Sequence, residues 1–494
     1  MVDPDIIAWV YPVGEAQKVD TVRYATHTVV KNKRSRPPRR QRRPEALAPA
    51  LLARSARETT PPPPAKSDQE LEYLPYLELR FSDGPRTSAG FIFGKDPDLS
   101  DILLPSIQGI SRRHFALTFR NDFEDGRYRL VVRDLGSTNG TTVAYDGQGK
   151  QCRSNCDWII SGFETPDTTQ KLEVELRGGG HMTRIIFRVV VARHDLTSPV
   201  YIKNVERFLH GAAVSDVLFG APRLQSVDAN KFHTAAPTPT NQPFLLLKRG
   251  VIGTGGFGDV IRLWNVSTGE EYACKRPNGY EYRREDWEKE IAIMKNMQHE
   301  NIVRLCFATL SPEPRLFLEY MELGNLSLEH KRLPFSLQDC WDILRQSLSA
   351  LVYLHCRREP IAHRDLKPQN ILVKSRNPLH VKLADFGLAK AGSLKTYCGT
   401  ATYRPPEIQM DNGSQRYTVA VDIWSLGVVI LQLEYGLPAP GYGSTMAWCA
   451  SIVKEARTWE SDGLIDILQR MLILEPNERA TAKACLSAVE AHYA

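Results

Sequence analysis

The sequence predicts a multidomain protein, with an N-terminal all-β sandwich followed by a C-terminal α+β domain. Its 494 residues allow roughly two to four domains. Residues 71–196 contain many short strand candidates separated by turn sequences such as EDGR and STNG. From residue 244 onward, a few strands are followed by longer stretches with a helical period, such as CWDILRQSLSALVYLH.

The remaining segments have the composition of connecting chain. Residues 1–30 contain IIAWVYPV, a short apolar run that resembles a strand, and residues 31–70 are basic and then proline-rich. We expect residues 1–70 to be mostly disordered. Residues 197–243 end in AAPTPTNQP and are expected to form a linker. The predicted division is therefore a disordered region over 1–70, a sandwich over 71–196, a linker over 197–243 and a second domain over 244–494.

The net charge of +6 comes from one local tract. Residues 31–43, KNKRSRPPRRQRR, carry eight basic residues and no acidic residue, and the rest of the chain holds 55 basic and 57 acidic residues. Such a tract is typical of a nuclear import signal or a nucleic-acid contact, with a solvated disordered linker as the alternative. Direct nucleic-acid binding is not expected, because no folded basic or aromatic platform accompanies the tract.

The composition also indicates the compartment. We find no apolar run long enough to span a bilayer and no N-terminal secretory signal, so no membrane association is expected. The nine cysteines have no repeated short spacing, which argues against a disulfide framework. We expect the nucleus, or otherwise the cytoplasm, as the location.

A glycine-rich segment opens the second domain. GTGGFGDV contains Gly253, Gly255, Gly258 and Val260. A strand follows this segment, whereas a helix would follow in a dinucleotide-binding site. Such a hairpin can lie close over phosphate oxygens and donate backbone N–H groups to them. A lone pattern of this kind also occurs in ordinary tight turns.

Charged residues follow at defined places. Lys275 ends the apolar strand YACK, where an ammonium group is costly unless it is paired. Glu290, in the helix-like EDWEKEIAIMKNM, is the candidate partner, and a lysine held in this way can bind the phosphates of ATP. HRDLKPQN then supplies Asp365, and a strand is followed by Asp385 in DFG.

In this order and spacing, residues 244–494 resemble a eukaryotic protein kinase domain of the serine/threonine type, in the calcium/calmodulin-kinase-like group. The resemblance implies ATP and Mg²⁺ as cofactors and proteins as substrates. It makes Asp365 the catalytic base and lets Lys367 steady the γ-phosphate. It makes Asn370 and Asp385 the Mg²⁺ ligands.

The same resemblance implies the nucleotide pocket and the activation loop. Glu319 and Met321 lie in the hinge that holds adenine. Thr396 stands where related kinases carry an activating phosphate, and Arg364, next to the base, can pair with it. An unmodified loop threonine is the alternative for Thr396. Thr400 resembles the threonine that hydrogen-bonds the catalytic aspartate and lysine.

Three segments of the predicted sandwich form a second pattern. GISRRHFALTF (109–119) by itself fits the start of a strand as well as a phosphate site. Taken with FGK (93–95) and GSTNGT (136–141), it resembles a forkhead-associated (FHA) domain, which binds phosphothreonine peptides. The resemblance places five residues at the peptide: Lys95, Ser111, Arg112, Thr138 and Asn139.

Two features of this segment depart from the family pattern or leave its interpretation open. The family pattern usually has arginine at the position of Lys95, and lysine lacks the bidentate fork, so weaker phosphate binding is expected. Asn139-Gly140 also fits a plain hairpin turn. Residues 146–170 are interpreted as an insertion.

An FHA domain ahead of a serine/threonine kinase resembles the DNA-damage and cell-cycle checkpoint kinases, especially those of fungi. The resemblance implies docking on phosphothreonine-containing adaptors or on another copy of the chain, with activation by trans-autophosphorylation. The pathway rests on analogy, because Thr169-Gln170 and Ser414-Gln415 both lie outside the N-terminal tail. The alternative is a phosphopeptide-dependent scaffold with minor kinase activity.

Overall fold

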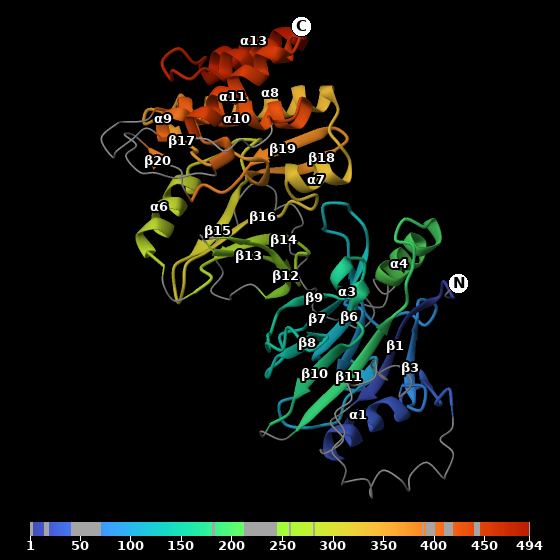
Figure 1. The fold of residues 1–494 in the computed structure, drawn as a ribbon. Coiled ribbons are helices and arrows are strands. Elements are labelled where there is room, and N and C mark those ends of the chain that lie inside the picture. Colours follow the sequence, from blue (N-terminus) through green and yellow to red (C-terminus); the bar gives the residue numbers. More distant parts are fainter. Residues whose placement is uncertain are drawn as a thin grey trace, which may run out of the picture. The chain divides into compact units, whose positions relative to one another are not determined.

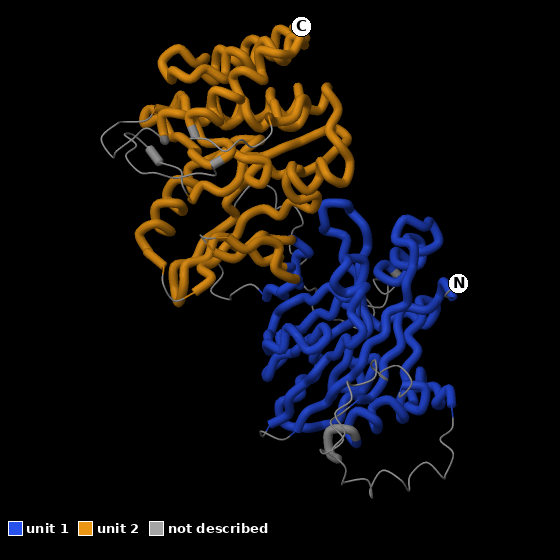
Figure 2. Tube along the Cα trace, in the orientation of Figure 1, with its two compact units in different colours: residues 1–249, 264–270 blue, residues 250–263, 271–494 orange. Residues whose placement is uncertain are grey.

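The computed structural model describes residues 3–13, 19–40, 71–179, 183–211, 245–255, 258–279, 282–387, 390–391, 401–409, 418–438 and 445–493. The chain forms two compact units, one of residues 1–249 with 264–270 and the other of residues 250–263 with 271–494 (Figure 2). None of the described helices is both long enough and apolar enough to cross a membrane.

The first unit contains a six-stranded sheet, in the order β2-β3-β1-β11-β10-β8, and a five-stranded sheet, in the order β5-β4-β6-β7-β9 (Figure 1). The strands are β1 (Ile6–Val13), β2 (Ser35–Arg36), β3 (Tyr76–Arg80), β4 (Phe91–Gly94), β5 (Ile102–Leu103), β6 (Phe115–Arg120), β7 (Arg129–Asp134), β8 (Thr141–Tyr145), β9 (Asp157–Ile159), β10 (Leu172–Arg177) and β11 (Arg184–Val191).

Aromatic side chains join the two sheets. Phe93 of β4 stacks on Phe115 of β6, with 4.4 Å between ring centroids. Phe93 also lies 5.9 Å from Phe187 of β11, which belongs to the other sheet. All three rings are buried in one core, so the predicted all-β sandwich is confirmed.

The disorder expected over residues 1–70 is wrong for residues 3–13 and 19–40. Strand β1 pairs antiparallel with both β11 and β3, so it lies inside the six-stranded sheet. Helix α1 (Val19–Lys31) follows and buries Ala25 and Val29 against the same core. The partners of β1 lie far along the chain, so local composition could not reveal the pairing. Residues 41–70 lie outside the described part of the chain.

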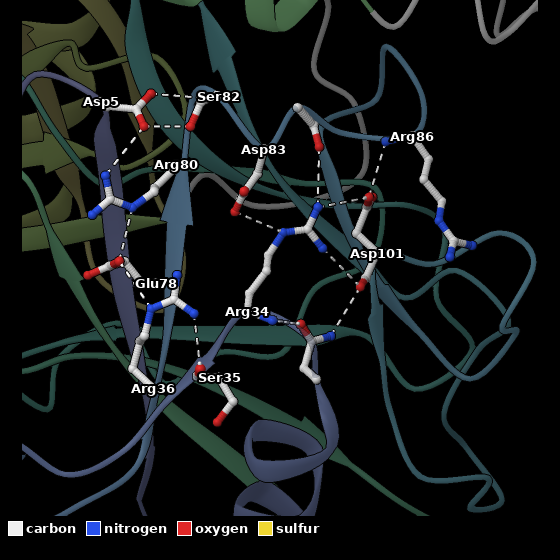
Figure 3. A network of polar contacts seen from close by, with 12 residues as sticks. Asp5, Arg34, Ser35, Arg36, Glu78, Arg80, Ser82, Asp83, Arg86 and Asp101 are labelled. Atoms are coloured by element: carbon white, nitrogen blue, oxygen red, sulfur yellow. Dashed lines mark hydrogen bonds and ion pairs between the residues drawn. The ribbon is translucent and has the colours of Figure 1, made fainter.

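The basic tract also forms part of this unit. Arg34 is 4% exposed, and its guanidinium lies 4.8 Å from the centre of the Phe91 ring. Figure 3 shows this guanidinium between Asp83 and Asp101, with nitrogen–oxygen distances of 3.4 Å and 3.9 Å. In the same view Arg36 faces Glu78 at 3.4 Å.

Two further arginines of the tract contact the unit. Arg39 lies over the rings of Trp9 and Tyr76, at 5.4 Å and 5.3 Å from their centres. Arg40 forms an ion pair of 2.8 Å with Glu72. A solvated disordered linker is therefore the wrong interpretation of residues 31–40, because four arginines there have partners in the fold.

The linker expected over residues 197–243 begins later than predicted. Helix α4 (Pro199–Gly211) buries Tyr201, Val205 and Phe208 in the sandwich core. Their spacing places them on one face of a helix, which explains why the segment folds. The insertion at 146–170 likewise contains strand β9 and the short helix α3 (Glu164–Thr168). Residues 212–244 lie outside the described part of the chain.

The second unit begins with a five-stranded antiparallel sheet and continues with helices (Figure 1). The strands of the sheet are β12 (Leu246–Gly255), β13 (Gly258–Asn265), β14 (Glu271–Arg276), β15 (Leu305–Thr309) and β16 (Arg315–Glu319). The short strands that follow are β17 (Ile361–Ala362), β18 (Ile371–Arg376), β19 (Leu379–Leu383) and β20 (Lys390–Ala391). The helices are α6 (Arg284–Lys295), α7 (Leu326–Arg332), α8 (Leu337–His355), α9 (Pro406–Gln409), α10 (Ala420–Glu434), α11 (Thr445–Thr458), α12 (Leu464–Met471) and α13 (Ala482–Tyr493).

The helical part is organised around α8 and α10. A capping box of Ser336 and Asp339 starts α8 by satisfying two backbone N–H groups. Helix α10 is buried at every position from Val421 to Leu431, so it forms the centre of this part of the core. This arrangement confirms the predicted α+β domain.

Replacing Arg34 by alanine is expected to lower the free energy of unfolding of the first unit by about 3 kcal/mol. The change leaves Asp101 buried with one cation fewer, and burial already raises the pKa of that carboxyl despite Arg34. Arg36→Ala is the control; its side chain is 42% exposed, and its loss should cost less than about 1 kcal/mol. The measurement is the urea dependence of hydrogen exchange in peptides from β1 and β4, and equal losses in the two variants would contradict the role assigned to Arg34.

Candidate functional sites

Lys275 lies at the centre of the first candidate site. Its ammonium nitrogen is 2.7 Å from Glu290 Oε1 on α6 and 2.8 Å from Asp385 Oδ1 after β19. Burial opposes the charge on this 8%-exposed side chain, but the two carboxylates raise the pKa of Lys275 above its usual value. Burial likewise opposes ionisation of Asp385, but Lys275 outweighs it and lowers the pKa of that carboxyl. Burial raises the pKa of Glu290, although Lys275 opposes that rise. The three side chains form one cluster around the Lys275 ammonium group.

Asp365 lies in a second cluster. Lys367 Nζ and Asn370 Nδ2 donate to Asp365 Oδ2 at 2.7 Å and 2.9 Å. Asn370 Nδ2 also donates to the Asp365 backbone oxygen at 2.8 Å. Direct hydrogen bonds therefore bring together the predicted catalytic residues Asp365 and Lys367 and the predicted Mg²⁺ ligand Asn370.

Asp422 of α10 fixes the backbone of the loop that contains Asp365. Its carboxylate accepts the backbone N–H groups of His363 and Arg364 at 2.9 Å and 2.8 Å. It also contacts His355 Nε2 at 2.8 Å. Burial opposes the negative charge, but the contact with His355 outweighs it and lowers the pKa of Asp422. Arg364 itself is buried at a positive φ of 73°.

Two oxygen donors in this region fit a magnesium ion. The pairing of Ile371 with Leu383 brings Asn370 and Asp385 to the same end of the β18–β19 ribbon. The amide nitrogen of Asn370 is directed at Asp365, which leaves its oxygen for another partner. The side chain of Asp385 is 35% exposed while one of its oxygens binds Lys275. Amide and carboxylate oxygens are ligands that Mg²⁺ prefers.

The glycines of GTGGFGDV differ in what requires them. A side chain at Gly258, which has a φ of 136°, would bring its Cβ within 2.1 Å of the Arg276 carbonyl oxygen. The backbone packing therefore demands glycine at 258. Among the described residues, a Cβ at Gly255 meets no atom within 4 Å, and one at Gly253 meets only Val260. The open space at these two positions is where a phosphate can approach.

The hinge candidates lie at the end of β16, where Glu319 is its last residue and Met321 comes two residues later. The carboxylate of Glu319 accepts from Lys382 Nζ at 2.6 Å and from the Arg304 N–H at 2.8 Å. Its side chain is thus occupied, in keeping with an adenine contact made by backbone. Met321 is buried. Thr396 and Thr400 lie outside the described residues.

The predicted phosphopeptide residues meet at one edge of the first unit. Ser111 Oγ accepts the Thr138 N–H at 3.0 Å and lies 3.3 Å from Thr138 Oγ1. The Lys95 N–H donates to the Ser111 carbonyl at 3.1 Å, which places these two residues side by side. Arg112 follows directly. Loops from three places in the sequence therefore bring the hydroxyls of Ser111 and Thr138 together beside the backbone of Lys95.

Asn139 belongs to the same edge. Its Nδ2 donates to the Arg177 carbonyl at 3.0 Å, across to the end of β10. Gly109 has a φ of 88°, and a Cβ there would lie 2.1 Å from Asn139 Nδ2. The amide of Asn139 is thus packed between the Gly109 loop and the end of β10.

Two supporting residues brace these loops. Asp134 is buried and accepts five hydrogen bonds, from the N–H groups of Gly136, Ser137 and Asn155 and from the hydroxyls of Ser137 and Thr141. Sequence reasoning missed Asp134, although an aspartate just before a Gly-Ser turn is a signal for such a cap.

His114 is the second brace. Its Nδ1 accepts the Ser111 N–H at 3.2 Å, and its Nε2 lies 3.1 Å from the Gly140 carbonyl oxygen. The ring therefore links the loop before β6 to the loop before β8. Asp96, which contacts Arg112 at 2.6 Å, was also missed, because nothing in the local sequence indicates that pair.

Known proteins share both parts of this architecture. A protein kinase domain model matches residues 247–489, and an FHA domain model matches residues 91–161. Myosin light chain kinase A of Dictyostelium discoideum is 32% identical over 255 residues, which is 48% of this chain and 84% of that protein. The chain belongs to the protein kinase family.

The chain combines its kinase domain with an FHA domain, and two serine/threonine-protein kinases of yeasts are among its relatives. Serine/threonine-protein kinase cds1 of Schizosaccharomyces pombe is 34% identical over 266 residues, covering 48% of this chain and 56% of the relative. Serine/threonine-protein kinase RAD53 of Saccharomyces cerevisiae is 27% identical over 423 residues, covering 80% of this chain and 48% of the relative. The chain thus spans about half the length of these two relatives.

A solved structure shares the fold. The crystal structure of Rad53 1-466 in complex with AMP-PNP matches with a TM-score of 0.53 and 23% identity, over 81% of this chain and 90% of that one. The expected combination of an FHA domain and a serine/threonine kinase domain is confirmed by these matches.

Acid is expected to destabilise the first unit through His114. Burial lowers the pKa of this imidazole below its usual 6.5, despite the contact with Gly140. When the pH falls below 6.5 the unfolded chain takes up the proton first, so the stability present at neutral pH is lost. We expect a lower urea midpoint at about pH 5.5 than at about pH 7.5, and a smaller difference in His114→Asn. Pulse proteolysis in urea measures it, and an equal acid loss in the variant would contradict the assignment.

Proposed function

We propose that this protein is an ATP-dependent serine/threonine protein kinase whose FHA domain docks it on phosphothreonine peptides. The observation that carries the kinase activity is the contact of Lys275 with both Glu290 and Asp385. In kinases this lysine must be held by the helix that follows it, while the aspartate of DFG stays at the phosphates. The ion pair of Lys275 with Glu290 and the contact of Asp385 with the same ammonium group support this arrangement.

The proposed roles follow from the chemistry of phosphoryl transfer. Asp365 accepts the proton of the substrate hydroxyl. The hydroxyl oxygen of the substrate bonds to the γ-phosphorus of ATP, and the bond between the γ-phosphorus and the bridging oxygen of the β-phosphate breaks, which releases ADP. Lys367 and Lys275 offset the charge on the phosphate oxygens. Asn370 and Asp385 would hold Mg²⁺, which neutralises phosphate charge when bound. The backbone at Gly253, Gly255 and Gly258 covers the phosphates next to Val260, and the backbone at Glu319 and Met321 holds adenine.

Activation is proposed to occur between copies of the chain. A phosphate on Thr396 would supply the anion for Arg364, whose backbone neighbours the base. Thr400 would contact Asp365 and Lys367. Docking through the FHA domain, on a phosphorylated adaptor or on another copy, raises the local concentration of one kinase near another.

The proposed setting is nuclear checkpoint signalling in response to DNA damage, with the cytoplasm as the alternative location. The likeness to cds1 and RAD53 supports this setting. The arginines Arg34, Arg36, Arg39 and Arg40 do not add support for nuclear import, because they contact their own unit.

Phosphate on Thr396 is expected in the wild type and absent in Asp365→Ala. The full chain is incubated with ATP and Mg²⁺, and sites are read by mass spectrometry. The rate per molecule should rise with protein concentration, because the reaction is between copies. Arg345→Ala, a half-exposed position on α8 away from the clusters around Lys275 and Asp365, serves as the control and should retain the phosphate. A rate per molecule independent of concentration would contradict activation in trans, and no phosphate in the wild type would contradict self-activation.

The scaffold alternative is separated by a second pair of changes. Ser111→Ala and Asn139→Ala remove the proposed phosphopeptide contacts, and Asp365→Ala removes the base. If the protein is a kinase, all three variants should fail to complement loss of the gene, with only Asp365→Ala lacking activity on a generic peptide. Survival of function in Asp365→Ala alone would instead establish the scaffold.

A further inference from the structure

Arg112 has an anionic partner inside its own domain. Its Nε and Nη2 lie 2.7 Å and 2.6 Å from the same oxygen, Oδ2, of Asp96. The Arg112 side chain remains 73% exposed, although one edge of its guanidinium is held by Asp96. The backbone adds to this arrangement, since the Asp96 N–H donates to the Arg112 carbonyl at 3.2 Å.

Asp96 is itself fixed. Its other oxygen, Oδ1, accepts the N–H groups of Asp98 and Leu99 at 2.9 Å and 3.3 Å. The side chain is only 11% exposed, in contrast to Arg112. Two backbone N–H groups already hold the Asp96 carboxylate in place. The ion pair therefore fixes the position of the flexible Arg112 side chain.

We propose that Asp96 is a positioning residue for phosphothreonine recognition, which holds the guanidinium of Arg112 by its side edge and keeps the end of the fork available to the phosphate. This inference rests on the proposed docking function. A guanidinium has five N–H donors, and the contact with Asp96 uses two of them. The two N–H groups at the end of the fork have the spacing that matches a pair of phosphate oxygens.

The composition of the site makes this positioning important. Among the five predicted contact residues, Arg112 is the one arginine, because Lys95 stands where the family pattern has arginine. Bidentate recognition therefore depends on Arg112. An arginine that is already immobilised loses less conformational entropy when the phosphate arrives, and this strengthens binding.

A purely electrostatic view predicts the opposite effect. Asp96 places a negative charge beside Lys95 and Arg112, so its removal would increase the attraction for an anion. An ion pair with an exposed partner contributes little to fold stability, so loss of the pair should leave the fold intact. A change in binding then shows whether the positioning of Arg112 or the repulsion between Asp96 and the phosphate is the larger effect. The same loop provides a control, because Asp98 is exposed and carries the same charge.

The test measures binding by the full chain with fluorescence anisotropy. The probe is a fluorescein-labelled peptide pool with phosphothreonine at the centre of random flanks, and the same pool with threonine is the reference. Asp96→Asn keeps an oxygen for the N–H groups of Asp98 and Leu99 and removes the charge. We expect it to bind the phosphorylated pool about threefold or more weakly than Asp98→Asn. Equal or tighter binding by Asp96→Asn overturns the inference.

A double-mutant cycle separates positioning from a general loss of loop structure. In an Arg112→Ala background, Asp96→Asn should have no further effect on binding, because the group that it positions is gone. An undiminished effect in that background would make Asp96 a structural residue and overturn the inference. If the wild type binds neither pool, the docking function itself fails, and the inference falls with it. Wild-type binding combined with a null effect of Asp96→Asn rejects the inference alone.

Discussion

A buried ammonium group that needs two carboxylates determines the architecture of the kinase domain. Lys275 enters from a strand, Glu290 from a helix and Asp385 from the segment after a second ribbon. Removing any one of them leaves a charge without its partner in a place that water reaches poorly, which costs much more than an exposed pair. The Lys275 ammonium nitrogen therefore contacts both α6, through Glu290, and the segment after β19, through Asp385. The nearby cluster of Asp365, Lys367 and Asn370 depends on a similar device, because Asp422 fixes its backbone from α10.

In the FHA domain, hydrogen bonds to carboxylate and imidazole groups hold the recognition loops in place. Its recognition edge consists of loops, and loops need internal partners to hold a fixed shape. Asp134 supplies them as five accepted hydrogen bonds, His114 links two loops, and Asp96 holds an arginine. In both domains, a buried or anchored carboxylate prepares the groups that are proposed to meet phosphate.

The sequence allowed prediction of those parts of the molecule that depend on short segments. Gly253, Asp365, Asp385 and Ser111 lie in segments whose residue types and order are informative on their own, and the structure brings their neighbours together. The prediction failed where a partner lies far along the chain. The strand-like run that forms β1 was not assigned to a sheet, because its neighbours β3 and β11 lie far along the chain. The arginines near residue 34 were interpreted as an import signal, a nucleic-acid contact or a solvated linker, because Asp83, Glu78 and Asp101 follow much later. Helix α4 was taken for linker although its buried face has a helical spacing. The pair of Asp96 and Arg112 depends on how two loops meet, which no local pattern shows.

The central position of β1 has a consequence for how the chain matures. Strand β1 is made first, but one of its two neighbours, β11, ends at residue 191. During synthesis the apolar segment IIAWVYPV must therefore wait, with its backbone unpaired on that side, until the whole sandwich has left the ribosome. Pairings of such long separation form slowly, and an exposed apolar strand is prone to associate with other chains in the meantime. The exposed edge of β1 is removed only when β11 pairs with it, so completion of the sandwich and protection of its earliest strand are the same event.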